Sequence, residues 1–560
     1  MANPYSFNYY TLAYGWRAFR FGSVALALGL AGATATFATD KQDEKAKDQT
    51  LSAPADLPHL PTAWQELIFS YLDGRAQRNL LPTGKAIRPA MLERFRRATS
   101  LEVRRQDPRG MTRILQDYAG NTRLKKISFQ AGFRIAAADL HELARRFPAL
   151  EELVFNPGSR GYRTSLDAAA LTAIASFTQL KTLGLPRLWV ANHGGFAQVS
   201  LAPLAALQQL DDLDLTGNNT LDDEHLGFLN QLTGLKRLSL SGTRCSGTFL
   251  EELAPETNLE TLNLQGCLLR PGVLSGLAAH PNLTFLGLGN TPVEDGDLPF
   301  IGALVQLRHL DLSGDRNLAT PKGIQQLGSL RDLRRLDLNH NSTLGTPGLA
   351  AVAAALPGLE ELNLARMGKL AGEGGGIGPL VHLARLRKLD LANTRLPAGS
   401  LAPLAGLEHL EYLDLTKTRL GAADIAVIQG KHALTTLILD ETAITDAHLE
   451  QFSALQSLKV LSLRRVRISD HRGVAALVRF QGLTHLNLSN LQYFTWDERG
   501  EIPSWPLPAV GQPDLEALLA LPHLGYLDLR GTAISEASKE RFKKAFAAQH
   551  QGRHLQVRHP

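Results

Sequence analysis

Cysteine is almost missing from this 560-residue chain, and aromatic residues make up only 6% of it. The two cysteines, Cys245 and Cys267, lie in the middle of the sequence, so no pair can staple either end. We expect two reduced thiols in the core, because secreted domains that depend on disulfides use cysteines in number. With few large side chains available, leucine and alanine must supply most of the buried surface, which suits a stack of small, similar layers.

An excess of one charge is also missing. Lysine and arginine together number 59 against 54 acidic residues, so the net charge is only +5. No long basic run interleaved with aromatic residues is present, as a nucleic-acid-binding surface would require. We therefore expect no nucleic-acid partner.

Catalytic signatures are missing as well. The sequence has no H-E-x-x-H pair, no Walker lysine loop and no G-x-S-x-G elbow. Neither cysteine stands in the Cys-x-Asp setting that some bacterial ligase effectors use, and the adjacent charges of 222–225 are typical of a solvated turn. We expect no catalytic residue, no cofactor and no metal site, and hence no enzyme.

One uncharged stretch near the start of the chain has the features of an export signal. Arg17 and Arg20 precede an uncharged stretch from Phe21 to Thr39, which contains small-x-small sites. This pattern fits a cleaved or anchoring export signal, and it equally fits an effector leader or an amphipathic helix. Membrane contact is expected only through 21–39. The charged residues that follow complete a signal-like segment and linker over 1–56.

Leucine is abundant and recurs in the pattern L-x-x-L-x-L. Most of its sixteen copies start 24 to 27 residues apart, which is the spacing of leucine-rich repeats. The copies start at Leu124, Leu150, Leu180, Leu210, Leu235, Leu259, Leu283, Leu307, Leu333, Leu359, Leu386, Leu410, Leu434, Leu458, Leu483 and Leu524.

Each repeat reads as a half-buried strand, a turn rich in Asn, Thr or Gly, and a helical Ala/Leu segment. One such unit cannot bury its apolar face alone, so stacking is required, with parallel strands on the concave side and helices on the convex side. The sequence thus predicts an α/β leucine-rich-repeat solenoid, a horseshoe, over 121–532. Residues 533–560 should form a C-terminal cap with a helix and a last strand. An insertion at 491–513 is either a flap or a contact loop.

The segment 57–120 departs from the repeat and predicts a small helical unit. Leu60-Pro61, followed by Leu67, Ile68 and Leu72 at helical spacing, resembles the opening of an F-box, the module that docks on the Skp-type adaptor of cullin ubiquitin ligases. The resemblance implies that these five residues form an adaptor-docking surface. It is looser in the second half, where Thr83 and Ile87 replace the usual serine and aromatic residue. The alternative is an unrelated helical cap.

An F-box followed by repeats of this length is similar to the GALA family of bacterial type III effectors. The small residues at the start of the helical segments, as in Ile301-Gly302-Ala303-Leu304, also resemble that family. The resemblance implies a secreted virulence protein that acts in the host cytoplasm and recruits a target to a host ubiquitin ligase. The alternative is an exported protein of the periplasm or cell envelope that binds a protein partner and has no ubiquitin role.

The target surface can be read from the strand register. Residues just before the second leucine of each repeat should point outward from the concave side. This row varies more than the aspartate-rich row between the second and third leucines, and its middle holds residue types enriched at binding hot spots. We expect a protein partner there, because an open arc offers no deep pocket for a small molecule. The predicted target-binding residues are Phe285, His309, Arg335, Glu361, Lys388 and Tyr412.

Overall fold

The computed structural model describes residues 97–558, apart from 104–114, 116–117, 131–133, 157–164, 167, 188, 191–199, 255, 315–319, 372–375, 467–470, 494–506, 509–511 and 533. The chain divides into two units, one of Met1–Thr99 with Arg109–Leu124, and one of Ser100–Pro108 with Lys125–Pro560. The five residues expected to dock an adaptor and the uncharged segment 21–39 lie outside the described residues. The second unit contains the repeats.

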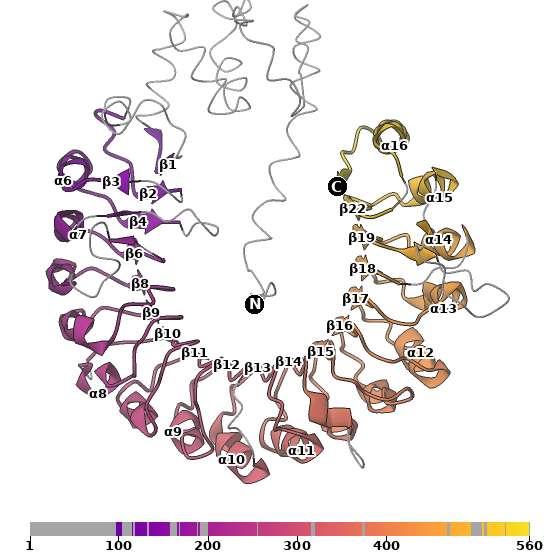
Figure 1. Ribbon diagram of the computed structural model, residues 1–560, viewed down its shortest axis with the longest axis horizontal. Coiled ribbons are helices and arrows are strands. Elements are labelled where there is room, and N and C mark those ends of the chain that lie inside the picture. The colour runs from indigo at the N-terminus through magenta and orange to yellow at the C-terminus, as the bar shows by residue number, and fades with distance from the viewer. Residues whose placement is uncertain are drawn as a thin grey trace, which may run out of the picture. The chain divides into compact units, whose positions relative to one another are not determined.

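Among the described residues, eighteen strands of the second unit form one sheet in which every pairing is parallel. Figure 1 shows the strands along the inner side of a curved array and the helices along the outer side. In spatial order the strands are β1 (Ser100–Val103), β2 (Lys126–Phe129), β4 (Glu152–Phe155), β6 (Thr182–Gly184), β8 (Asp212–Asp214), β9 (Arg237–Ser239), β10 (Thr261–Asn263), β11 (Phe285–Gly287), β12 (His309–Asp311), β13 (Arg335–Asp337), β14 (Glu361–Asn363), β15 (Lys388–Asp390), β16 (Tyr412–Asp414), β17 (Thr436–Ile438), β18 (Val460–Ser462), β19 (His485–Asn487), β22 (Tyr526–Asp528) and β23 (Gln556–Arg558).

The leucine pattern accounts for sixteen of these strands, and the predicted solenoid is confirmed. The other two extend the sheet at its ends. β1 pairs with β2 although it lies in the segment assigned to the helical unit, and β23 pairs with β22 inside the C-terminal cap. The sheet therefore begins about one repeat earlier than the first L-x-x-L-x-L copy, because the short sequence of β1 carries its buried positions as Leu101 and Val103.

The core is a stack of leucine layers. Leu283, Leu286 and Leu288 of one repeat are fully buried, and Leu286 lies in register with Leu310 of the next strand. Equivalent leucines repeat along the array, so each layer covers the apolar face of its neighbours. Burial of such side chains contributes roughly 1.5–3 kcal/mol each, which is why stacking rather than any single repeat stabilises the fold.

The outer side is built from short helices, because a repeat of this length leaves room for only a few helical turns. The α-helices are α6 (Ala137–Arg146), α7 (Ala168–Ile174), α8 (Phe249–Glu252), α9 (Leu298–Gly302), α10 (Pro321–Gln325), α11 (Thr346–Ala355), α12 (Ala422–Gln429), α13 (Asp446–Gln451), α14 (His471–Leu477), α15 (Gln512–Ala517) and α16 (Glu536–Gln549). The remaining repeats use 3-10 turns, among them η5 (Ala202–Ala206), η7 (Gly227–Gln231), η8 (Val273–Ala279), η11 (Gly378–His382) and η12 (Ala402–Gly406). Small residues permit close stacking here, since a Cβ on Gly302 would lie 2.2 Å from the carbonyl oxygen of Gln326.

Asn and Thr in the turns satisfy buried backbone carbonyls. The Nδ2 of Asn341 donates to the carbonyl oxygens of Leu312 and Leu338 at 2.8 and 3.0 Å, and so links two repeats. At the equivalent position Thr394 donates only to Leu391 of its own repeat, at 2.8 Å. The turn residues predicted from the sequence therefore hold the strand ends of successive repeats together.

Two local features were not predicted. The first described repeats carry a second, three-stranded parallel sheet made of β3 (Arg134–Ile135), β5 (Ser165–Leu166) and β7 (Trp189–Val190). In the insertion at 491–513, β20 (Gln492–Tyr493) and β21 (Leu507–Pro508) pair antiparallel. The insertion therefore leaves and rejoins the array at adjacent points.

The C-terminal cap has the helix and strand expected of it. Helix α16 begins after Ser535, whose hydroxyl accepts a hydrogen bond from the amide of Ser538 at 3.1 Å. Its apolar face buries Phe542 and Phe546 against the preceding repeat, and β23 then adds the last strand. A charged helix of this kind covers the final leucine layer, which would otherwise face water.

Candidate protein-binding face

The six predicted target-binding residues lie side by side. We call the residues that precede the second leucine the first row. Phe285, His309, Arg335, Glu361, Lys388 and Tyr412 are successive members of it, and each is paired in register with the next across β11 to β16. Neighbouring strands are about 4.8 Å apart, so the six side chains lie next to one another in one row, which we call the strip.

The aromatic end of the strip is a ring pair. The rings of Phe285 and His309 meet edge to face with centroids 4.7 Å apart. Burial lowers the pKa of His309 below its usual value. The space over Gly287, beside Phe285, is filled, because a Cβ on Gly287 would lie 2.8 Å from Asn263 Oδ1 and 3.2 Å from Phe285 Cε1. Gly287 therefore makes room for the side chains of Asn263 and Phe285.

The middle of the strip is an ion-paired group. Glu361 accepts from Arg335 on one side, with Nε 3.1 Å away, and from Lys388 on the other, with Nζ 2.8 Å away. Lys388 is exposed, whereas Arg335 and Glu361 are half-buried. Such pairs contribute little to stability, roughly 0–1 kcal/mol, but they hold the charged groups in fixed positions on the surface.

Tyr412 is less exposed than the sequence suggests. Its ring is half-buried and its hydroxyl is buried. Burial, followed by the nearby negative charges of Asp414 and Asp390, raises the pKa of the hydroxyl above its usual value. Tyr412 therefore offers one side of its ring to a partner and little of its hydroxyl.

The second row, between the second and third leucines, is an architectural ladder. Asp311, Asp337, Asp390 and Asp414 each accept a hydrogen bond from the amide two residues on, at 2.8 to 2.9 Å. Asn363 makes the same bond to Ala365 at 3.0 Å. These side chains hold the turn that ends each strand, which explains why Asp and Asn recur there.

Several of these carboxyl groups are electrostatically strained. Burial, and then repulsion from Asp311, raises the pKa of Asp337 to about 7. Burial, and then repulsion from Asp414, raises the pKa of Asp390 to about 7 as well. Burial, with repulsion from a neighbouring carboxylate, also raises the pKa of Asp414 and of Asp440, which follows the third leucine of the β17 repeat. The concave face thus carries closely spaced carboxyl groups in the second row, beside the first row.

A further set of residues was missed in the sequence. We call the residues immediately before the first-row positions the rim row. Backbone hydrogen bonds join each of them to the next strand, for example from Arg334 N to Arg308 O at 2.9 Å. Its charges are linked across strands, as in Lys125 to Glu151 at 2.5 Å. The signal was available, because the sign alternates at the repeat period in the sequence, one position ahead of the row that was predicted.

Other candidate sites have structural explanations. The Asp223 carboxylate accepts from the amides of Ser246, Gly247 and Phe249 at 2.5 to 3.2 Å, so it anchors the next repeat. Cys245 and Cys267 are free and buried, and burial raises the pKa of both thiols. Within the described residues, no group of three or more His, Cys, Asp or Glu side chains could hold a metal ion, and no helix is long and apolar enough to cross a membrane.

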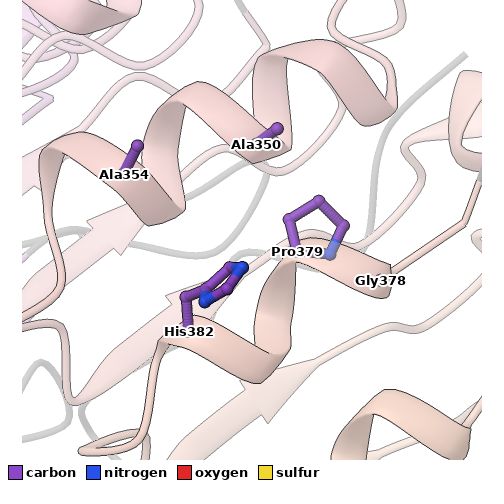
Figure 2. Close-up of a pocket in the computed structure, with 5 residues that line it drawn as sticks. All are labelled: Ala350, Ala354, Gly378, Pro379 and His382. Carbon is purple, nitrogen blue, oxygen red and sulfur yellow. The ribbon is translucent and has the colours of Figure 1, made fainter.

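A shallow hollow of about 560 Å³ lies between the helices of two neighbouring repeats. Figure 2 shows Ala350 and Ala354 on α11 facing Pro379 and His382 on η11. Its lining is almost entirely small and apolar, and His382 supplies the one titratable side chain among its lining residues. It lacks the converging polar groups of a small-molecule site.

A curated protein and several solved structures are similar to parts of this chain. No family model matches the chain. A stretch of 113 residues is 36% identical to part of Receptor-like protein 9a of Arabidopsis thaliana. The matched stretch is 19% of this chain and only 11% of that protein.

Three solved structures are similar. An internalin (inlF) of Listeria monocytogenes has 22% identity and a TM-score of 0.42, over 57% of this chain and 83% of its own. The TLR13–ssRNA13 complex has 18% identity and a TM-score of 0.43, over 75% of this chain and 54% of its own. The leucine-rich-repeat protein LIC12759 of Leptospira interrogans has 17% identity and a TM-score of 0.35, over 85% of this chain and 92% of its own.

Proposed function

We propose that this chain is a binding protein without catalytic activity, and that its target is another protein held against the first row. The observation that carries the proposal is the unbroken strip from Phe285 to Tyr412, in which aromatic and charged side chains stand in register on six adjacent strands. Tyr and Arg dominate the energetics of protein interfaces, and a broad sheet face suits a large partner.

A protein target suits this face better than a nucleic acid. The second row behind the strip carries Asp311, Asp337, Asp390 and Asp414. Binding of nucleic acid depends on neutralising phosphates with basic residues, and the basic residues of the strip, Arg335 and Lys388, are already paired with Glu361. A protein partner can present single charges and apolar side chains to the same surface.

The first test replaces three residues of the strip together, Phe285→Ala, Arg335→Ala and Tyr412→Ala. We expect loss of at least about 2 kcal/mol of binding free energy toward the partner that a chemical crosslinking screen with the wild-type chain recovers. Folding should survive, because these side chains lie outside the leucine layers. The measurement is titration calorimetry, with a thermal melt as the folding check.

A matched triple variant on exposed residues outside the strip, Val305→Ala, Val381→Ala and Arg385→Ala, serves as the control. Wild-type affinity in the strip variant would overturn the proposal and direct attention to the 491–513 insertion or to the outer helices.

We further propose that the chain is a substrate adaptor of a cullin-type ubiquitin ligase. Support comes from the resemblance of 57–98 to an F-box, above all Leu60-Pro61 followed by Leu67, Ile68 and Leu72. In this proposal the F-box-like segment holds a Skp-type adaptor while the solenoid selects the target. Such a division of labour needs two separate surfaces on one chain, and the strip on β11 to β16 is one of them.

The adaptor role is tested with Leu60→Ala combined with Pro61→Ala in the full chain. We expect the double variant to lose binding to a purified Skp-type adaptor, because both side chains belong to the proposed apolar contact, while its thermal melt stays unchanged. Equal pull-down by wild type and variant would contradict the adaptor role and leave target binding by the solenoid untouched.

The same resemblance supports a proposed location, namely secretion by a bacterium and action in the host cytoplasm. The alternative proposal is a periplasmic or envelope-bound protein, supported by the uncharged segment 21–39 that follows Arg17 and Arg20. The two differ in the mature amino terminus, since cleavage near residue 36 or 39 in a periplasmic fraction favours the envelope.

A further inference from the structure

The rim row and the first row carry charges that alternate in sign from strand to strand. On the N-terminal strands, Lys126 pairs with Glu152 at 2.5 Å. Further along, Arg237 pairs with Asp212 at 2.9 Å. On the later strands, Arg334 lies 3.4 Å from Glu360, and Arg387 pairs with Glu411. Each basic residue in these pairs faces an acidic residue on an adjacent strand, so the face largely neutralises itself.

The alternation breaks at β11 and β12. The pattern calls for an acidic residue next to Arg334, but the rim position of β12 is Arg308 and the first-row position is His309. On its other side Arg308 meets the uncharged Thr284, to which it is joined by a backbone hydrogen bond of 2.8 Å. Arg308 is exposed, and its guanidinium forms no ion pair with a carboxylate of the described residues. Arg334 has two carboxylates of its own, Asp332 at 3.6 Å and Glu360 at 3.4 Å. Arg308 on the adjacent strand is therefore the arginine whose acidic partner is missing.

The nearby aspartates do not supply the missing charge. The carboxylates of Asp311 and Asp337 accept from the amides of Ser313 and Asn339, both at 2.8 Å. These bonds direct the carboxylates toward the C-terminal ends of their strands, whereas Arg308 precedes the N-terminal end of β12. An external carboxylate is therefore the group that would complete the ladder.

Beside the break lies the apolar end of the strip. The Phe285 and His309 rings form their edge-to-face pair on the same two strands, β11 and β12, and both are half-buried. An apolar side chain can pack on such a ring edge, and doing so removes water from the neighbouring arginine. A carboxylate–guanidinium contact is stronger where water is excluded.

We propose that the surface formed by Thr284, Phe285, Arg308, His309 and Arg334 binds a segment of the partner protein in which an Asp or Glu adjoins an aliphatic or aromatic residue. The carboxylate binds Arg308, on the Arg334 side, and the apolar side chain packs on Phe285 and His309. This inference rests on the proposed protein-binding function and names the chemistry of its ligand. The single missing charge favours one carboxylate over a polyphosphate backbone, which would need a row of unpaired basic residues to neutralise it.

The probe is a phage-displayed library of random twelve-residue peptides, panned on the full chain as wild type, as Arg308→Glu and as Arg385→Glu. Arg385 is exposed in the turn before β15, outside both rows, so it controls for net charge. We expect wild type and Arg385→Glu to enrich peptides with an acidic residue beside an apolar one. Arg308→Glu should lose that enrichment, and its Kd for the best wild-type peptide should rise about tenfold or more.

The contrary outcomes are distinct. Enriched peptides that lack an acidic residue, identical selection by Arg308→Glu, or no enrichment at all would overturn this inference. If the enriched peptides lack an acidic residue but lose binding to the Phe285, Arg335 and Tyr412 triple variant, the proposed function stands and only this inference fails. Peptides that bind the triple variant normally would count against the proposed function itself. A fluorescent single-stranded RNA 20-mer that binds wild type and is weakened by Arg308→Glu would identify a nucleic-acid surface and reject the inference.

Discussion

Replacing Leu338 with Asp should unfold the central repeats or lower the melting temperature by on the order of 10 °C. Leu338 is fully buried, and its amide donates to the carbonyl oxygen of Asn363 on the next strand at 2.9 Å. A carboxylate at this position would lie in a leucine layer without a partner, which costs several kcal/mol even when it becomes protonated. Since each repeat is stabilised only by its neighbours, the damage should spread to adjacent layers.

The matched control applies the same substitution to an exposed leucine. Leu268 is 64% exposed, so Leu268→Asp should leave the thermal melt almost unchanged. Circular dichroism melts of the three full chains make the comparison. A Leu338→Asp melt that coincides with wild type would contradict the placement of Leu333, Leu336 and Leu338 in the core.

Removing two charges from the second row should stabilise the protein above neutral pH. The pKa of Asp337 and of Asp390 is raised from 3.8 to about 7 in the folded chain. The folded state therefore holds protons that the unfolded state releases, so stability falls as pH rises from about 4 to about 7, and the penalty is complete above that range. Asp337→Asn with Asp390→Asn should recover about 1–3 kcal/mol at pH 8 and little at pH 4.

Asparagine is a suitable replacement because the chain already uses it. Asn363 accepts the same turn amide that Asp337 and Asp390 accept in their repeats. Asp214→Asn is the control, since its neighbours in the second row, Gly184 and Ser239, carry no charge. Melts at pH 4 and pH 8 that differ equally for wild type and the double variant would show that these carboxyl groups do not set the pH dependence.

The fold could be predicted largely from the sequence because one pattern specifies it. The alternation in L-x-x-L-x-L determines the strand, its register and its buried face together. The six strip residues could therefore be placed in one row from the sequence alone. The ends of the sheet were harder to predict. β1 and β23 lack the full leucine pattern, and the buried residues there are Leu101 and Val103 in β1 and Leu555 just before β23.

The site was less predictable, because it depends on contacts between repeats. Pattern reading could not show that the Phe285 ring fills the space over Gly287, or that the Tyr412 hydroxyl is buried. Nor could it show that the second-row aspartates bond turn amides and crowd one another. These facts depend on side-chain packing across neighbouring strands, which the spacing of leucines does not encode.

Photo-crosslinking from the strip tests the central claim most directly. p-Benzoylphenylalanine is placed at Glu361, in the middle of the first row, or at Val381, which is exposed on η11. If the strip holds the target, the partner recovered with the wild-type chain should crosslink from position 361 and not from position 381. Crosslinking from 381 alone would place the target on the helical side and contradict the account.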